Sequence, residues 1–354
     1  EEFYQYSHER LIESVGTEHP DIARSLNNMA AFYRDINEFE RAEALYEESI
    51  ALWEHLLGTD HPALAGTLNS LGALYDDRGE YDRALPRYQR SLAIRQTAFG
   101  SEHPSVASSL NNMAGLQRAW GHYDRAAALY ERSASIWKAS FGSRHLHVAD
   151  SLSNVAWVYQ LQGQTATALD RLALSLETEE RNLTSNLFRG SERDKYDYLN
   201  LFEGSTNGAV SFHLQQVSNR DRAARLALTT LLRRKGRVLD VLGESMTLLR
   251  QRLSPSDRDL LDRLTDIYQQ MANLAASVQV NRDRLLELEM DAEIVQQQLL
   301  ERNAEFRRAV EPVTIEAVRA EMPENAALVE FVKYRPIEPL APAVSRLEQP
   351  RYAA

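Results

Sequence analysis

Apolar residues in the first half of the chain recur every three or four positions, in stretches that short polar segments separate. This spacing puts the apolar side chains of one stretch on one face of a helix. In the first pair of stretches these residues are Ala23, Leu26, Met29, Ala30 and Tyr33, followed by Phe39, Ala42, Leu45, Tyr46, Ile50 and Trp53. The pattern predicts a helix, a short turn and a second helix.

The same pattern returns at a fixed interval of 42 residues. The interval is clearest for Gly16, Gly58, Gly100 and Gly142, and for His19, His61, His103 and His145. Such a period is typical of repeat proteins, in which each unit buries its apolar face against its neighbours. We expect four repeats, at about 16–57, 58–99, 100–141 and 142–183, in a solenoid that covers 1–185. Residues 1–15 align with the second helix of a further unit, so we expect the chain to begin inside a longer array.

The turn inside each repeat carries a residue that tolerates positive φ, which lets the first helix stop. These residues are Asn37, Gly79, Gly121 and Gly163. Small side chains follow five positions later, at Ala42, Ala84, Ala126 and Ala168. We expect these alanines to let neighbouring helices approach closely, while tyrosines one turn further on fill the wider gaps.

The motifs L-N-N-L/M-A-x-x-Y and G-x-Y-x-x-A carry a resemblance to a known family. The chain resembles the tetratricopeptide repeat in its 42-residue form, as in kinesin light chains and many bacterial proteins. This resemblance implies an all-α, right-handed superhelical solenoid whose first helices line a concave face. The fourth unit departs from the pattern, with Leu146 in place of proline and Thr165 in place of an aromatic residue, which suits a boundary repeat.

Polar residues on the first helices form rows along the predicted solenoid. Asn27, Asn69 and Asn111 are equivalent by 42-residue steps, and a second row lies beside them. A side-chain amide both donates and accepts, so it can bind the backbone of an extended peptide, as the resemblance implies. The alternative is that the amides bridge neighbouring repeats. The candidate peptide-binding residues are Arg24, Asn27, Asn28, Arg34, Asn69, Asn111, Asn112, Arg118 and Asn154.

The repeated histidines are poor candidates for a metal site. Residues one repeat apart lie on separate helix pairs about 10 Å from each other, too far for one ion to bind both at about 2 Å. A histidine before Pro20, Pro62 or Pro104 is better explained as a turn between repeats, with the proline in the first turn of the next helix. We expect no metal and no cofactor.

Composition narrows the classes of protein. The chain has 354 residues and a net charge of −11, which argues against nucleic acid as the main partner. It has no cysteine, which excludes disulfides and thiolate chemistry and fits a reducing compartment. No apolar run is long enough for a membrane span, and the N-terminus does not resemble a signal peptide. We expect a cytoplasmic protein that does not contact a membrane.

The 42-residue period ends after Leu183, but helical patterns continue. We expect a helical linker domain at 186–322, with a long helical hairpin at about 256–309 whose second arm carries a heptad seam. That seam could instead form a coiled-coil homodimer. The basic cluster from Arg233 to Arg237 could bind an acidic partner or a phosphate, although a solvated face paired with nearby carboxylates is the plainer interpretation.

A short apolar run at 326–334 predicts a β-strand. The order of repeats, LRRKGRVLDVL, hairpin and strand is similar to the approach to the CHAT domain, a caspase- and separase-like protease module. Residues 323–354 would then be the start of such a domain. The catalytic His and Cys of that family would lie downstream, and no catalytic residue can be assigned in this chain.

Three functions are therefore open. The first is a non-enzymatic scaffold that binds a protein or peptide. The second is the regulatory, sensing segment of a cysteine protease whose catalytic domain follows this chain. The third is homodimeric assembly through the heptad seam.

Overall fold

The computed structural model describes residues 1–187, 197–215, 219–242, 250–275, 281–303, 306–307, 313–322, 332–334 and 351–353. The chain divides into two compact units. Unit 1 contains the described residues from Glu1 to Ile136, and unit 2 contains those from Trp137 onward.

The helix pairs predicted from the 42-residue period are present, and the array is all-helical. Unit 1 contains α1 (Glu2–Val15), α2 (Pro20–Asp35), α3 (Phe39–Leu57), α4 (Pro62–Asp77), α5 (Tyr81–Phe99) and α6 (Pro104–Ala119). Helix α7 (Tyr123–Phe141) crosses the boundary between the units. The fourth repeat, α8 (Leu146–Leu161) and α9 (Thr165–Leu187), lies in unit 2.

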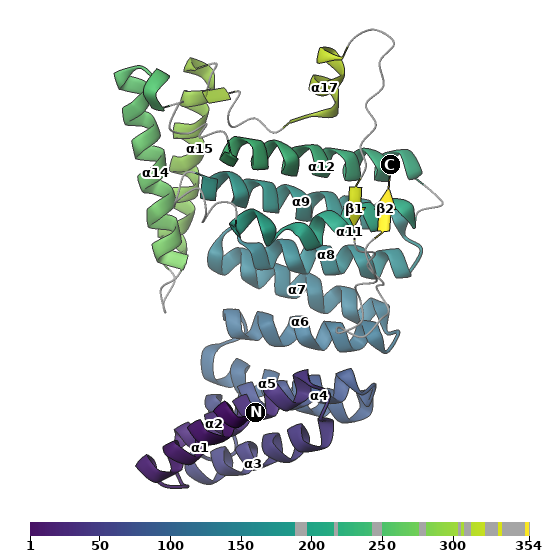
Figure 1. Ribbon diagram of the computed structural model, residues 1–354, viewed down its shortest axis with the longest axis vertical. Coiled ribbons are helices and arrows are strands. Elements are labelled where there is room, and N and C mark those ends of the chain that lie inside the picture. Colours follow the sequence, from purple (N-terminus) through teal and green to yellow (C-terminus); the bar gives the residue numbers. More distant parts are fainter. Residues whose placement is uncertain are drawn as a thin grey trace. The chain divides into compact units, whose positions relative to one another are not determined.

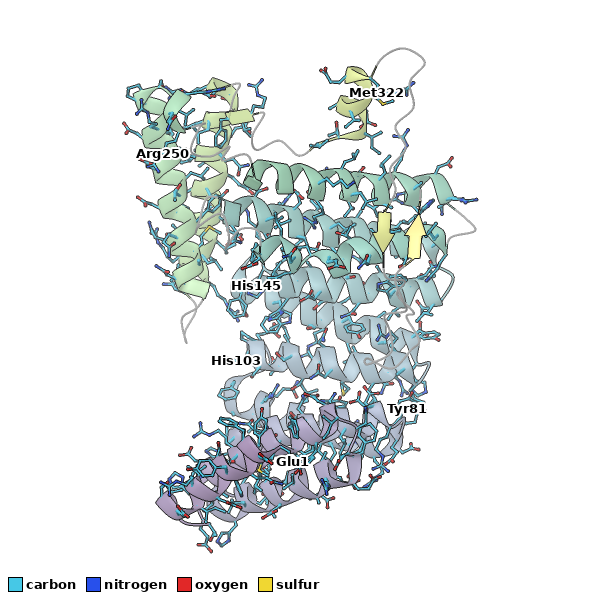
Figure 2. All side chains as sticks on the ribbon, viewed as in Figure 1. Glu1, Tyr81, His103, His145, Arg250 and Met322 are labelled. Atoms are coloured by element: carbon cyan, nitrogen blue, oxygen red, sulfur yellow. The ribbon has the colours of Figure 1, made fainter. Side chains whose placement is uncertain are left out.

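The repeated histidines begin the first helix of each repeat. The Nδ1 atom of His61 accepts a hydrogen bond from the backbone N–H of Ala63 at 3.2 Å, and the same contact recurs at His19, His103 and His145. Figure 2 labels His103 and His145 at these positions. Each imidazole thus satisfies one of the N–H groups that a helix start leaves without a partner. The sequence indicated a turn at these histidines but not this capping role.

The turn residues adopt the predicted conformation. Asn37 has φ 61° and Gly79 has φ 72°, both in the left-handed region. At Gly79 the chain closes the end of α4 with a hydrogen bond from the N–H of Glu80 to the carbonyl of Tyr75, at 2.8 Å. This is the pattern of a helix that ends on a left-handed residue.

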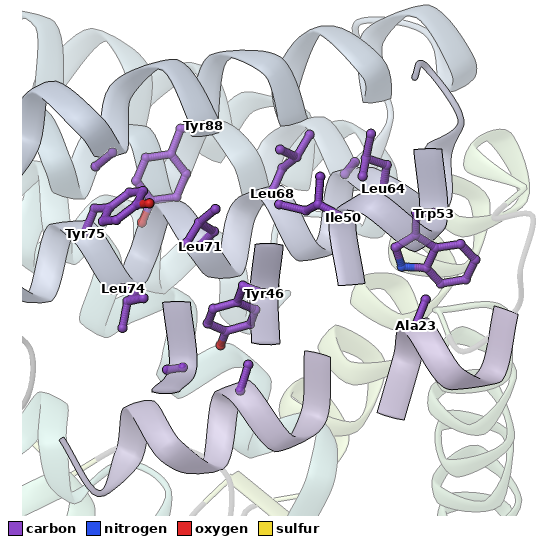
Figure 3. Packing of buried hydrophobic residues seen from close by; sticks show 14 of the residues in the cluster. Ala23, Tyr46, Ile50, Trp53, Leu64, Leu68, Leu71, Leu74, Tyr75 and Tyr88 are labelled. Carbon is purple, nitrogen blue, oxygen red and sulfur yellow. The ribbon is translucent and has the colours of Figure 1, made fainter. Parts of the chain in front are cut away.

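The core of unit 1 is built from equivalent positions of successive repeats (Figure 3). Ala42 and Ala84 are fully buried, as their small size in the repeat predicts. Tyr88 fills the adjacent space and reaches Gly72 so closely that a Cβ there would lie 3.0 Å from its ring. The close approach of α4 and α5 thus depends on a residue without a side chain at position 72.

A row of buried serines ties the two helices of each pair together. Ser49, Ser91, Ser133 and Ser175 donate their hydroxyls to the backbone carbonyls of Ala23, Ala65, Ala107 and Ala149, at 2.7, 2.7, 2.9 and 2.8 Å. These serines keep the 42-residue interval. Their period was a signal for a structural role that the hydrophobic pattern alone did not reveal.

Unit 2 packs the fourth repeat against further helices, α11 (Glu203–Leu214) and α12 (Arg220–Leu242). Leu169 and Leu172 of α9 share one cluster with Phe212 of α11 and Ala223 of α12, and Figure 1 shows α9, α11 and α12 beside one another. The compact units therefore divide within the repeats, at residue 137, whereas the repeat period ends near residue 183.

Helices α14 (Pro255–Ala275) and α15 (Arg282–Arg302) form a separate cluster within unit 2. Leu288, Ala292 and Val295 of α15 are buried against residues of α14 that include Leu264 and Ile267. The heptad positions of α15 therefore face α14.

The last described elements are α17 (Ile315–Glu321) and two short strands. Strands β1 (Val332–Tyr334) and β2 (Arg351–Ala353) pair antiparallel, with Lys333 opposite Tyr352. The first part of the predicted strand, 326–331, lies outside the described residues. None of the helices in the described part of the chain is long and apolar enough to cross a membrane.

Candidate peptide-binding surface

The candidate residues lie on the first helices of the repeats. Helix α2 carries Arg24, Asn27, Asn28 and Arg34, helix α4 carries Asn69, and helix α6 carries Asn111, Asn112 and Arg118, all in unit 1. In unit 2, α8 carries Asn154, which is half-buried.

Two of the predicted amides bind each other. The Nδ2 group of Asn112 donates to Oδ1 of Asn69 at 3.0 Å, which joins α6 to α4. This pair therefore performs the bridging role that was the alternative to peptide binding. The bond also fixes the orientation of both amides, because each side chain is half-buried between two helices.

The equivalent bond one repeat earlier is missing. The counterpart of Asn69 is Asn27, but the counterpart of Asn112 is Ser70, whose side chain is shorter and carries no amide. Within the described residues, Oδ1 of Asn27 is buried and has no hydrogen-bond partner. A buried acceptor without a donor costs about 1–3 kcal/mol.

Arg34 is held by an ion pair between repeats. Its Nε donates to Oδ2 of Asp77 at 2.6 Å, which joins α2 to α4. Burial alone would lower the pKa of Arg34, but the hydrogen bond and the negative charge of Asp77 raise it above the ordinary value. Arg34 is therefore a permanent cation that is already paired with Asp77 of the same chain.

Arg118 occupies the position equivalent to Arg34 two repeats later. Its side chain is only 3% exposed, and its Nε has no hydrogen-bond partner among the residues described. Arg24 and Asn28, by contrast, are exposed, and Arg24 binds Asp21 on its own helix. Within the described part of the chain, the candidate set thus contains a donor without a partner at Arg118, an acceptor without a partner at Asn27, and exposed residues beside Asn27.

The histidines and the basic cluster are the other polar features that the sequence singled out. The described part of the chain contains no group of three or more His, Cys, Asp or Glu side chains arranged to hold a metal ion. The basic cluster on α12 differs from the solvated face that the sequence suggested. The side chain of Arg234 is only 11% exposed and binds Glu179 and Glu180 of α9 at 2.7 and 3.1 Å, since α12 packs directly on α9. The Arg237 side chain lies outside the described residues.

Stacked helix pairs with polar rows along their first helices define an α-helical repeat scaffold. The tetratricopeptide repeat family matches residues 1–54, 21–97, 65–139 and 124–180, which together cover half of the chain. The chain belongs to the tetratricopeptide repeat family. This repeat fold is typically non-enzymatic, and a scaffold of this kind fits a role in protein interaction.

Three solved structures are similar to part of the chain. BtubC (BKLC) from P. vanneervenii is 21% identical, with a TM-score of 0.47, over 64% of this chain and 87% of that chain. A putative kinesin light chain with nearly identical TPR-like repeats from Podosopora anserina is 21% identical, with a TM-score of 0.48, over 60% and 96%. A single-substitution variant of that protein is 23% identical, with a TM-score of 0.49, over 60% and 94%. No curated protein matches the chain.

Proposed function

We propose that unit 1 binds an extended peptide segment of a partner protein across α2, α4 and α6. In this proposal the array coils as a right-handed superhelix with these first helices on its concave side. The observation that carries the proposal is the buried, unpartnered Oδ1 of Asn27 in the described part of the chain. A peptide N–H would supply the donor that Ser70 cannot.

The other candidate residues divide between two roles. Asn28 and Arg24 are exposed beside Asn27 and would contact peptide groups directly. The Asn69–Asn112 pair would present a rigid polar surface, because each amide is already fixed by the other. Asn111 and Arg118 would extend this surface within unit 1, whereas Asn154 belongs to unit 2 and is not part of it. Preorganised polar groups of this kind lower the entropy that binding costs.

The test begins with twelve-residue peptides selected by display against the full chain. Binding of the selected peptides is then measured by calorimetry. We expect Asn27→Ala to weaken binding by about tenfold, which is the loss of one buried hydrogen bond. We expect Ser70→Asn to weaken it similarly, because the new amide can donate to Asn27 in the way that Asn112 donates to Asn69.

Asn273→Ala is the matched control, since Asn273 is an exposed asparagine on α14. It should leave affinity unchanged. Peptides that bind the Asn27→Ala and Ser70→Asn variants as tightly as the parent chain would show that the groove proposal is wrong.

A second candidate is that unit 2 links the repeats to a downstream protease domain similar to CHAT. The antiparallel pair of β1 and β2 supports it, because a β-containing domain was expected at 323–354. Sequencing the natural gene past the codon for Ala354 tests this candidate. A downstream sequence without a His and a Cys at the ends of predicted strands would rule this function out.

A further inference from the structure

A large cleft lies within unit 2, between α9, α12 and α15, which Figure 1 labels. Its volume is about 1110 Å³, at the upper end of the range of about 300–1,000 Å³ that is usual for ligand sites. Its apolar wall is formed by Leu169, Ala173, Leu226, Ile294 and Leu300. The cleft contains none of the candidate peptide-binding residues of the repeats.

The charged lining of the cleft is cationic, although the whole chain carries a net charge of −11. Five arginines and three glutamates line it, so it has two more positive than negative charges. Each glutamate already has a cation. Glu177 binds Arg181 at 2.8 Å, Glu180 binds Arg234 at 3.1 Å, and Glu293 lies 3.5 Å from Arg144. Two of the arginines, Arg222 and Arg225, also pair with carboxylates outside the lining, Asp170 and Glu316, in contacts exposed to solvent.

Arg233 is the lining arginine that lacks a partner. Its side chain is half-buried, and its Nε is buried without a hydrogen-bond acceptor in the described part of the chain. No carboxylate among those residues forms an ion pair with it. The neighbouring Arg234, in contrast, binds two buried glutamates. A buried guanidinium donor without an acceptor is costly, and an anionic ligand would remove that cost.

The length of the cleft indicates an elongated ligand. Its lining positions on α9 run from Leu169 to Thr184, a distance of about 22 Å along a helix. An extended peptide of about seven residues has this length. On α12, Arg225 and Arg233 are about 12 Å apart along the axis, which matches two side chains four residues apart in an extended strand.

We propose that this cleft binds an extended acidic segment of a partner protein, with two carboxylates four residues apart and apolar side chains between them. Arg233 binds one carboxylate. Arg225 binds the other in exchange for Glu316, with which it forms a pair whose side chains are 69% and 74% exposed. The apolar wall accommodates the residues between. A phosphate polymer fits less well, because it has no apolar groups to pack against the apolar wall of the cleft.

The test uses the full chain and a capped peptide of sequence Leu-Glu-Ala-Leu-Ala-Glu-Leu, with binding followed by fluorescence anisotropy. We expect Arg233→Met, which keeps the apolar stem, to weaken binding by about tenfold or more. The peptide with glutamine in place of glutamate should lose affinity to the same extent. Lys235→Met removes a positive charge from an exposed site on the same helix and should leave binding unchanged.

Thermal unfolding separates a binding role from a structural one. We expect Arg233→Met to unfold at the same temperature as the parent chain or higher, and Arg234→Met to unfold at a lower temperature. The variant Asn27→Ala, which tests peptide binding by unit 1, should still bind the acidic peptide in the cleft of unit 2. The two proposals can therefore fail independently of each other.

Four outcomes would overturn the proposal. The first two are that the acidic peptide does not bind the parent chain, or that it binds Arg233→Met equally well. The third is that Arg233→Met loses as much stability as Arg234→Met. The fourth is that inorganic phosphate or a single-stranded oligonucleotide, and not the peptide, binds in a way that depends on Arg233. The last result would assign the cleft to a different class of anion.

Discussion

Among individual residues, Glu179 in unit 2 has an unusual environment. It shares Arg234 with Glu180, so that two buried carboxylates face one guanidinium. Burial raises the pKa of Glu179 to about 7, although Arg234 and the hydroxyl of Ser205 oppose that shift and the charge of Asp150 adds to it. One arginine cannot neutralise both carboxylates, so the buried site favours the protonated form of Glu179 more than water does.

The raised pKa predicts a specific pH dependence of stability. A carboxyl that binds its proton more tightly in the folded chain stabilises the fold at low pH, and this contribution is lost as pH rises from about 4.5 to about 7. We therefore expect the melting temperature of the parent chain to fall relative to Glu179→Gln by several degrees over this interval. Circular dichroism melts at pH 5, 6, 7 and 8 measure it.

Glu177→Gln provides the control, because Glu177 is an exposed carboxylate on the same helix. The melting temperature of Glu177→Gln should change with pH in the same way as that of the parent chain. If the melting temperature of Glu179→Gln also changes in that way, the raised pKa assigned to Glu179 is wrong.

The first helix of each repeat begins and ends at residues that recur every 42 positions. A histidine caps the start of the first helix in each repeat. A residue with positive φ lies in the turn between the two helices of the repeat. Gly100, between the second and third repeats, has φ 86° and ψ 159°, a conformation nearly restricted to glycine. Gly66, in contrast, lies in the middle of α4, where alanine is preferred.

These two glycines predict opposite effects of the same substitution. Gly100→Ala should lower the free energy of unfolding by about 1–3 kcal/mol, because the added Cβ strains the backbone. Gly66→Ala should raise it by about 0.5–1 kcal/mol. In neither place would the Cβ meet another atom within 4 Å, so the difference isolates the backbone conformation. Urea unfolding measures both, and changes of the same sign would contradict the assigned conformations.

Over the whole molecule, burial differs strongly from helix to helix. Helix α4 buries Leu64, Leu68, Leu71 and Tyr75, among others, whereas α1 contains no buried residue. Local stability in a protein follows buried apolar contact, so the opening free energy should vary in the same order.

Hydrogen exchange followed by mass spectrometry tests this gradient. We expect the amides of α1 to exchange close to the rate of an unstructured peptide and those of α4 to exchange only through the largest opening of unit 1, at least about a hundredfold more slowly. Equal protection of the two helices would show that α1 is stabilised by contacts other than burial.

Much of the fold was predictable because the information is local and repeated. Four copies of one pattern fixed the helix pairs, and Asn37 and Gly79 marked the turns. The candidate surface was less predictable. Periodicity placed Asn69 and Asn112 on equivalent helices, but it did not decide whether their amides face a ligand or each other, because that depends on side chains 43 positions apart.

The sequence by itself determined the repeat, the helix starts and ends, and the rows of asparagine, since each of these depends on residues within one unit. Only the tertiary structure decided which polar groups in the described part of the chain have partners. Ser70 leaves Asn27 without a donor, Asp77 holds Arg34, and Glu179 and Glu180 take Arg234 but leave Arg233. The physical reason is that a hydrogen bond or ion pair needs two groups within about 3 Å, and packing between helices, not spacing along the chain, sets that distance.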